Sequence, residues 1–335
     1  MSHQIPPCEL LIIRNADVHR LMSMKDCIEI IDRTMRTVSS GGADLPLRAI
    51  ARVPGTPNVF GVMPGFLRDP ESLGAKVIAV FPANAQRGRS SHMGVVMLFD
   101  PREGVPIAIL DAAAITAIRT AAASAVATRM LARANAADLA ILGTGEQAAT
   151  HLEAIACIRP LTSIRVWGRS MEKARAFAER ESARLGLSID VSATVQEAVA
   201  GASMVCATTH SKEPILQGAW IERGAHVNLV GASTLDAREA DEALVMRSSF
   251  FVDFRPSAMA QAGELRAAME MHRADASRHI RGEIGDVLNG SISGRTSDEE
   301  ITVYKSLGIA AQDLATAHAV YERAKQSGAG TKVEF

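Results

Sequence analysis

A Gly-x-Gly-x-x-Ala sequence that starts at Gly143 can bind the pyrophosphate of a dinucleotide. It follows the apolar run 139–142, opens a predicted helix, and is followed by a second apolar run at 164–167. Gly143 permits a tight turn, Gly145 lets a pyrophosphate approach the backbone, and Ala148 allows close packing of helix on strand. Because strand, turn, helix and second strand come in the required order, the pattern favours a nucleotide site over a glycine-rich turn without a ligand. The loop residues that we expect to contact the cofactor are Gly143, Thr144, Gly145, Glu146 and Gln147.

The residues after the second apolar run indicate which dinucleotide is bound. Enzymes that use NAD usually place Asp or Glu there, where it accepts hydrogen bonds from the ribose 2′-hydroxyl. This chain has Arg169 and Ser170 instead, and the next acidic residue is Glu172. Arg169 can contact a 2′-phosphate through two parallel N–H groups, with the Ser170 hydroxyl beside it, although a solvated loop arginine has the same sequence signature. We expect NADPH/NADP as the cofactor, with NAD/NADH as the alternative.

Three positively charged residues stand in otherwise apolar runs. Lys76 lies within the strand-like run 73–81, and Arg48 and Arg119 have similar surroundings. A buried ammonium is unfavourable unless it is paired, so a structural salt bridge is the simpler explanation of any one of them. All three in a chain with a dinucleotide motif suggest a site for a small carboxylate, because arginine offers a planar fork of donors and lysine a point charge.

Composition narrows the class of protein. The 335 residues suggest about two domains, and 47% hydrophobic with 22% charged residues is typical of a globular chain and excludes a disordered one. The formal net charge of −1 leaves no basic excess for nucleic acid. The four cysteines form no Cys-x-x-Cys pair, no metal-ligand spacing occurs, and we find neither a signal peptide nor 18 uninterrupted apolar residues. We therefore expect a cytoplasmic protein without a metal, a membrane or nucleic acid as partner.

The predicted helices and strands that must position these residues follow two different patterns along the chain. The first third of the chain reads as mixed, with predicted strands at 10–13, 47–53, 59–63, 73–81, 95–99 and 106–110, a helix from residue 24 to about 38, and a long Ala-rich helix over 112–134. From residue 137, predicted strands at 139–142, 164–167, 204–207, 227–230 and 250–252 alternate with helices, and a last helix covers 307–325. This predicts an α/β chain with a Rossmann-type doubly wound parallel sheet and a mixed α+β domain.

Six short stretches lie in order along nearly the whole chain, and they are Pro46-Leu47-Arg48, Gly74-Ala75-Lys76, Leu98-Phe99-Asp100, 116–122, 143–148 and 305–315. Together they resemble the ornithine cyclodeaminase/mu-crystallin family. The resemblance implies a substrate-binding and dimerisation domain over 1–118 and 313–335, a Rossmann domain over 119–312, and a homodimer. Members deaminate and cyclise ornithine or lysine, reduce cyclic ketimines, or interconvert amino acids with 2-oxo or imino acids.

The resemblance also implies roles for individual residues. Arg48, Lys76 and Arg119 would be the catalytic residues that hold the substrate carboxylate near the nicotinamide. We assign Met63 and Ser233 to the substrate site as well. The further residues that we assign to the cofactor are Thr120, Arg169, Ser170, Thr208, Thr209, Gly231 and Ser233.

One departure separates two branches of the family. Cyclodeaminases carry an Asp shortly after the fifth Rossmann strand, where this chain has Ser233 in the sequence Gly231-Ala232-Ser233. That sequence and Arg169 resemble the ketimine-reductase and mu-crystallin branch. Loss of the carboxylate argues against cyclodeamination, unless another acid such as Asp236 replaces it.

We therefore expect an NAD(P)H-dependent reductase of small cyclic imino acids, such as 1-pyrroline-2-carboxylate or 1-piperideine-2-carboxylate, that transfers a hydride to the C=N carbon and yields proline or pipecolate. The proton donor would be Lys76 or an ordered water. The alternatives are an ornithine or lysine cyclodeaminase with recycled NAD, an amino-acid dehydrogenase or open-chain imine reductase, and a non-catalytic binder of small ligands.

Overall fold

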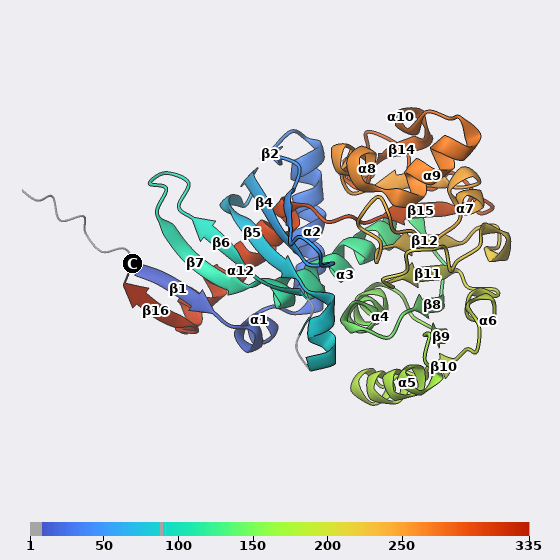
Figure 1. Cartoon of the computed structure of the whole chain (residues 1–335), viewed down its shortest axis with the longest axis horizontal. Helices are drawn as coiled ribbons and strands as arrows, with labels where there is room; N and C mark the ends of the chain where they lie inside the picture. The colour runs from blue at the N-terminus through green and yellow to red at the C-terminus, as the bar shows by residue number, and fades with distance from the viewer. Residues whose placement is uncertain (1–8, 88–89, 91, 335) are drawn as a thin grey trace, which may run out of the picture. The chain divides into compact units, whose positions relative to one another are not determined.

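The computed structural model describes residues 9–87, 90 and 92–334, which form two compact units (Figure 1). The described residues up to Arg119, together with those from Ile309 onward, form unit 1. Thr120–Gly308 form unit 2. The division falls within one long helix, α3 (Ala112–Leu131), between Arg119 and Thr120.

Unit 1 is built on a mixed sheet in the order β16-β1-β7-β6-β5-β4-β2, with β3 paired to β4. The pair β1–β7 is parallel and the remaining pairs are antiparallel. The strands are β1 (Glu9–Ile13), β2 (Ala43–Asp44), β3 (Ala49–Arg52), β4 (Val59–Arg68), β5 (Glu71–Val80), β6 (His92–Phe99), β7 (Pro106–Asp111) and β16 (Thr331–Glu334).

One face of this sheet is covered by helices. The helices of unit 1 are α1 (Asn15–Leu21), α2 (Met24–Ser39), the first part of α3 and α12 (Ala310–Ser327), with a 3-10 turn at Pro82–Arg87. The hydroxyl of Ser23 caps α2 by accepting the N–H of Asp26 at 3.1 Å. Helix α12, red in Figure 1, packs on β4, β5 and β6 and against α2. It is buried along most of its length, so it forms the core of the unit.

Unit 2 is a parallel sheet in the order β10-β9-β8-β11-β12-β15-β13-β14. Its strands are β8 (Asp138–Leu142), β9 (Ser163–Trp167), β10 (Asp190–Val191), β11 (Met204–Ala207), β12 (His226–Leu229), β13 (Ser249–Val252), β14 (Ile280–Glu283) and β15 (Thr302–Lys305). The strands β11, β12 and β15 are buried at every residue, as expected for parallel strands that helices cover on both faces.

Crossover helices connect these strands. They are α4 (Glu146–Ile158), α5 (Met171–Leu185), α6 (Val195–Val199), α7 (Glu242–Met246), α8 (Arg255–Gln261), α9 (Gly263–His272), α10 (Ala276–His279) and α11 (Ile284–Leu288), with a 3-10 turn at Gly218–Trp220. The chain runs outward from β8 through β9 to β10, and then returns to β11 on the other side of β8. This reversal is the switch point at which doubly wound sheets bind ligands. The predicted α/β fold class, with a Rossmann-type sheet and a mixed α+β unit, is confirmed.

The segment of residues 302–310 differs from the sequence prediction in two respects. Residues 302–305 form the central strand β15, which the prediction did not include, and the last helix begins at Ala310 rather than at residue 307. The buried carboxylate of Asp253 accepts the N–H groups of Leu307 and Gly308 at 2.7 and 2.6 Å. Because Gly308 also has a φ of +76°, these residues cannot join the helix. Among the described residues we find no helix with the length and hydrophobicity needed to cross a membrane.

Candidate functional site

Two of the three predicted cations of unit 1 converge on one buried carboxylate. The Nζ atom of Lys76, on β5, lies 2.9 Å from Oδ2 of Asp313, on α12. The Nε atom of Arg119, on α3, donates to Oδ1 of the same carboxylate at 2.9 Å. Arg119 also donates from Nη1 to the side-chain oxygen of Gln312 at 3.0 Å. The three charged side chains are 0–5% exposed, so the structure brings two sequence-predicted residues together around an acid that we did not predict.

Two paired glycines bring α12 close enough to the sheet for these contacts. Gly65 on β4 and Gly74 on β5 are direct cross-strand partners. A Cβ added at Gly65 would lie 3.0 Å from the Cβ of Ala310, and one at Gly74 would lie 3.0 Å from Leu314 and 2.0 Å from a neighbouring carbonyl. Lys76 follows Gly74 by two residues and therefore points to the same face of the sheet. The spacing of these residues thus places the ammonium under the first turn of α12.

Burial and neighbouring charge change the acidity of this cluster. Burial, reinforced by the positive charges of Arg119 and Arg48, lowers the pKa of Lys76 to about 8, although Asp313 opposes the change. Burial alone would raise the pKa of Asp313, but the charges of Arg119 and Lys76 outweigh it and hold that pKa below its usual value. Because the cations outnumber the carboxylate, the cluster has a surplus of positive charge, which can bind an anion.

The remaining residues assigned to the substrate in unit 1 lie around Lys76. Met63 is its direct partner on β4 and is buried. Arg48 is half-buried just before β3, and its charge lowers the pKa of Lys76. The hydroxyl of Thr116 accepts a hydrogen bond from Lys76 at 3.4 Å. The sequence analysis did not predict Asp313. The signal that could have revealed it was an acidic residue within the largely apolar stretch 305–315, which resembles the family.

In unit 2 the Gly-x-Gly-x-x-Ala loop has the geometry of a phosphate-binding turn. Gly143 follows β8 with a φ of +123°, and a Cβ there would lie 2.8 Å from the hydroxyl oxygen of Thr208. Gly145 is the N-cap of α4, and a Cβ there would meet nothing within 4 Å, so the space above it is open. Ala148 is fully buried, as close packing of helix on strand requires. These observations fit a bound dinucleotide, which would approach the backbone at Gly145.

The end of β9 is the second part of the predicted cofactor site. Arg169 is exposed in the turn after this strand. The Ser170 hydroxyl accepts the N–H of Lys173 at 3.3 Å and so caps α5. This hydroxyl keeps its own proton for donation. A Cβ added at Gly168 would lie 2.6 Å from a methyl group of Thr144, so this turn packs closely on the glycine loop.

The ends of β11 and β12 supply the other residues assigned to the cofactor. The Thr208 hydroxyl donates to the carbonyl of Leu142 at 3.0 Å, which joins the turn after β11 to the glycine loop. Thr209 and Gly231 share a buried carboxylate, Glu239, as hydrogen-bond acceptor. Ser233 is half-buried in the turn after β12. Thr120 is buried in α3, where unit 2 begins.

Comparison with known proteins agrees with this geometry. Residues 9–328 match the model of the ornithine cyclodeaminase/mu-crystallin family. The chain belongs to this family. A Delta(1)-pyrroline-2-carboxylate reductase of Bacillus cereus is 34% identical over 97% of this chain and 100% of its own length. The ketimine reductase mu-crystallin of Mus musculus is 36% identical over 84% of this chain and 86% of its own length.

A solved structure extends the similarity to three dimensions. It shows the Thermococcus litoralis Delta(1)-pyrroline-2-carboxylate reductase in complex with NADH and L-proline, and it superposes with a TM-score of 0.93. The two chains are 35% identical, and the match covers 96% of this chain and 100% of that one. The family resemblance predicted from the sequence is confirmed, and these relatives are named as a ketimine reductase or as reductases of pyrroline-2-carboxylate.

Proposed function

We propose that this chain is an NAD(P)H-dependent reductase of small cyclic imino acids, which converts 1-pyrroline-2-carboxylate or 1-piperideine-2-carboxylate to proline or pipecolate. The observation that carries the proposal is the buried pair of Lys76 and Arg119, whose two charges meet one carboxylate. This surplus of positive charge suits a substrate that has a carboxylate beside its C=N bond. Similarity to reductases of pyrroline carboxylate and of ketimines supports the same substrate class.

Arg119 is suited to orient the substrate. A guanidinium has five N–H groups in a fixed plane, and two of those in Arg119 reach Asp313 and Gln312. The others can donate to the substrate carboxylate, and Arg48 adds charge beside them. Because Asp313 and Gln312 fix the plane of the guanidinium, the bound carboxylate is held in one orientation, and this fixes the direction in which the imine carbon faces.

Lys76 is suited to supply the proton. Reduction adds a hydride to the imine carbon and a proton to the nitrogen, and a bound reduced nicotinamide supplies the hydride. With a pKa of about 8, Lys76 is protonated at neutral pH yet gives up its proton far more readily than an exposed lysine. Asp313 holds the ammonium at 2.9 Å and stays anionic, so the donor keeps its position.

The cofactor we propose is NADPH. The exposed Arg169 can pair with a 2′-phosphate, and the Ser170 hydroxyl at the N-terminus of α5 can donate to the same group. A charge-assisted contact of this kind contributes about 1.5–3 kcal/mol, which corresponds to roughly a tenfold to hundredfold preference over NADH.

A homodimer is the assembly we propose, formed through the face of the unit 1 sheet opposite to α12. Phe60, Ala79 and Met93 are direct neighbours across β4, β5 and β6, and Phe60 and Met93 are 44% and 51% exposed. A second copy of the chain would bury this apolar row. The next rows on the same face are Val62–Val77–Val95 and Pro64–Ala75–Met97. We also propose a cytoplasmic location, since the buried Cys27 and Cys206 form no disulfide among the described residues.

The rival function within the family is cyclodeamination of ornithine or lysine. That reaction must hold an α-amine and handle its protons, which suits a carboxylate. Ser233 offers only a neutral hydroxyl, and Asp236, the acid that would have to replace the missing carboxylate, is exposed. Both observations favour the reductase.

The near-ultraviolet absorbance of reduced nicotinamide tests the proposal over a panel of imino acids and amino acids. A reductase consumes NADPH with the cyclic imine. Release of ammonia from ornithine without net change in absorbance would show a cyclodeaminase instead. If the chain binds the imine but consumes no cofactor, it is a binding protein and the proposed activity is wrong.

A further inference from the structure

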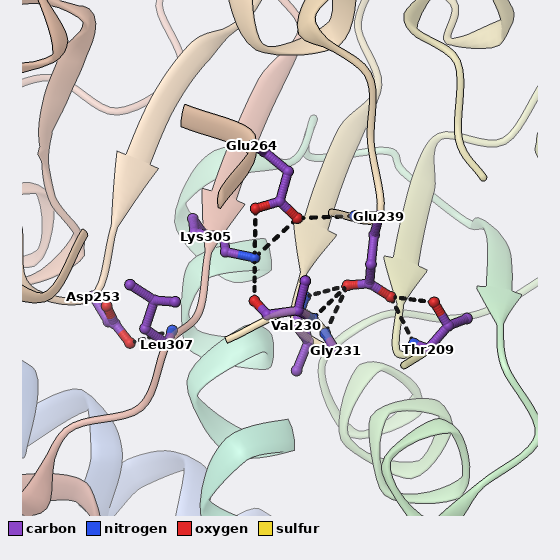
Figure 2. Close-up of polar contacts among 9 residues, drawn as sticks. Thr209, Val230, Gly231, Glu239, Asp253, Glu264, Lys305 and Leu307 are labelled. Carbon is purple, nitrogen blue, oxygen red and sulfur yellow. Dashed lines mark hydrogen bonds and ion pairs between the residues drawn. The ribbon is translucent and has the colours of Figure 1, made fainter. Parts of the chain in front are cut away.

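A buried carboxylate, Glu239, links the turns after β11 and β12 (Figure 2). Its Oε1 atom accepts the backbone N–H of Thr209 at 2.6 Å and the Thr209 hydroxyl at 2.9 Å. Its Oε2 atom accepts the N–H groups of Val230, Gly231 and Ala232 at 3.2, 2.6 and 3.4 Å. Both oxygens therefore face only donors, and the side chain is completely buried. Five donors on one carboxylate fix the two turns relative to each other.

A second carboxylate and a lysine hold Glu239 and the same turn from the other side. Oε1 of Glu264 accepts the backbone N–H of Glu239 at 3.1 Å. The Nζ atom of Lys305 lies 3.0 Å from Oε2 of Glu264 and donates to the carbonyl of Ala232 at 2.5 Å. The N–H and C=O groups of Ala232 are thus both held by buried charged side chains. Figure 2 shows Lys305 between the turn and Glu264.

The two turns are also in direct backbone contact. A Cβ added at Gly231 would lie 1.8 Å from the carbonyl oxygen of Thr209 and 2.5 Å from its nitrogen. No side chain can separate the turns at this position. The Glu239 carboxylate therefore bonds to two backbones that are also in direct contact with each other.

We propose that Glu239 is a positioning residue that fixes the turn of residues 230–233, and with it Ser233, for the nicotinamide half of the dinucleotide. This inference rests on the proposed function. In a doubly wound sheet the two halves of the dinucleotide lie on the two halves of the sheet. The glycine loop and Arg169 belong to the β8–β9 half, whereas Glu239 holds only the ends of β11 and β12. Glu239 therefore acts on one half of the ligand.

The test is Glu239→Gln, which keeps the size of the side chain but places an NH₂ group against N–H donors. Affinity for adenosine 2′,5′-bisphosphate, a probe of the β8–β9 half, should stay within about twofold of wild type. The rate of hydride transfer from NADPH should fall about tenfold or more, because the turn of residues 230–233 is no longer held in place for the nicotinamide. The control is Glu179→Gln, an exposed residue on α5, which should change neither quantity.

Amide hydrogen exchange of the same proteins tests the turn without any substrate. In Glu239→Gln, exchange in a peptide covering 228–235 should speed up about tenfold or more, while a peptide covering 143–150 should be unchanged. Unchanged exchange at 228–235, or an unchanged rate of hydride transfer, would overturn the inference. If Glu239→Gln lowers the melting temperature and also weakens binding of both adenosine 2′,5′-bisphosphate and NADPH, Glu239 has a general structural role, and the inference is overturned. If wild type itself fails to reduce the imine, the proposed function is wrong, and the exchange comparison still decides whether Glu239 fixes the turn.

Discussion

Replacing Asp313 by asparagine removes the carboxylate on which Lys76 and Arg119 converge. At 2.9 Å from each cation and fully buried, this group offsets two desolvated charges. Removing one partner of a buried ion pair costs about 3–5 kcal/mol, because the charge left behind is uncompensated. At roughly 2–4 °C per kcal/mol, the melting temperature should fall by roughly 6–20 °C. Since Asp313 raises the pKa of Lys76 against the effect of burial, that pKa should also fall below about 8.

Calorimetry of the variant should be compared with Asp26→Asn. Asp26 pairs with Arg323 at 3.0 Å, but it is 49% exposed, so we expect a loss of less than about 1 kcal/mol. The two variants differ mainly in burial. A carboxylate ligand such as L-proline should raise the melting temperature of Asp313→Asn more than that of wild type, because it restores a negative charge beside the cations. Equal melting temperatures for Asp313→Asn and Asp26→Asn would refute the reasoning.

Four further predictions concern the proposed site and assembly. Arg119→Leu should raise KM for the imine about tenfold to hundredfold without preventing folding, and normal kinetics would exclude Arg119 from the carboxylate site. The kcat/KM of wild type should fall above a pH of about 8, where Lys76 loses its proton. This fall should be absent in Lys76→Arg, and the same fall in the variant would show that it comes from titration of the substrate. Arg169→Ala should lower the preference for NADPH over NADH roughly tenfold or more in kcat/KM, and an unchanged ratio would show that Arg169 does not contact the phosphate. Phe60→Glu should yield monomers by light scattering, and a monomeric wild type would contradict the proposed dimer.

Local signals were sufficient for much of the fold. The sequence around Gly143 predicted a strand, a turn and a helix in the right order, because the motif places all of its requirements within a few residues. The same holds for α2, whose cap at Ser23 and apolar face are local features. Lys76 also stood out, since an ammonium within a buried strand pattern needs a nearby partner.

The partners of these residues could not be predicted in the same way. Asp313 lies 237 residues from Lys76, and the contact forms only because Gly65 and Gly74 let α12 approach the sheet. Strand β15 was missed because Lys305 made it look like a polar segment before a helix. Its charge is buried only because Glu264, 41 residues earlier, is packed beside it. Long-range pairing of charges leaves no periodic signal in a sequence.

The most direct test of the proposed reaction follows the hydride itself. The protein is incubated with 1-pyrroline-2-carboxylate and NADPH that carries deuterium at the transferable position of the nicotinamide, and the product is examined by mass spectrometry and NMR. Direct hydride transfer to the C=N carbon predicts proline that carries one deuterium at its α-carbon, formed in equal amount to the cofactor oxidised. Proline without deuterium, or proline and ammonia formed from ornithine with no net oxidation of cofactor, would contradict it.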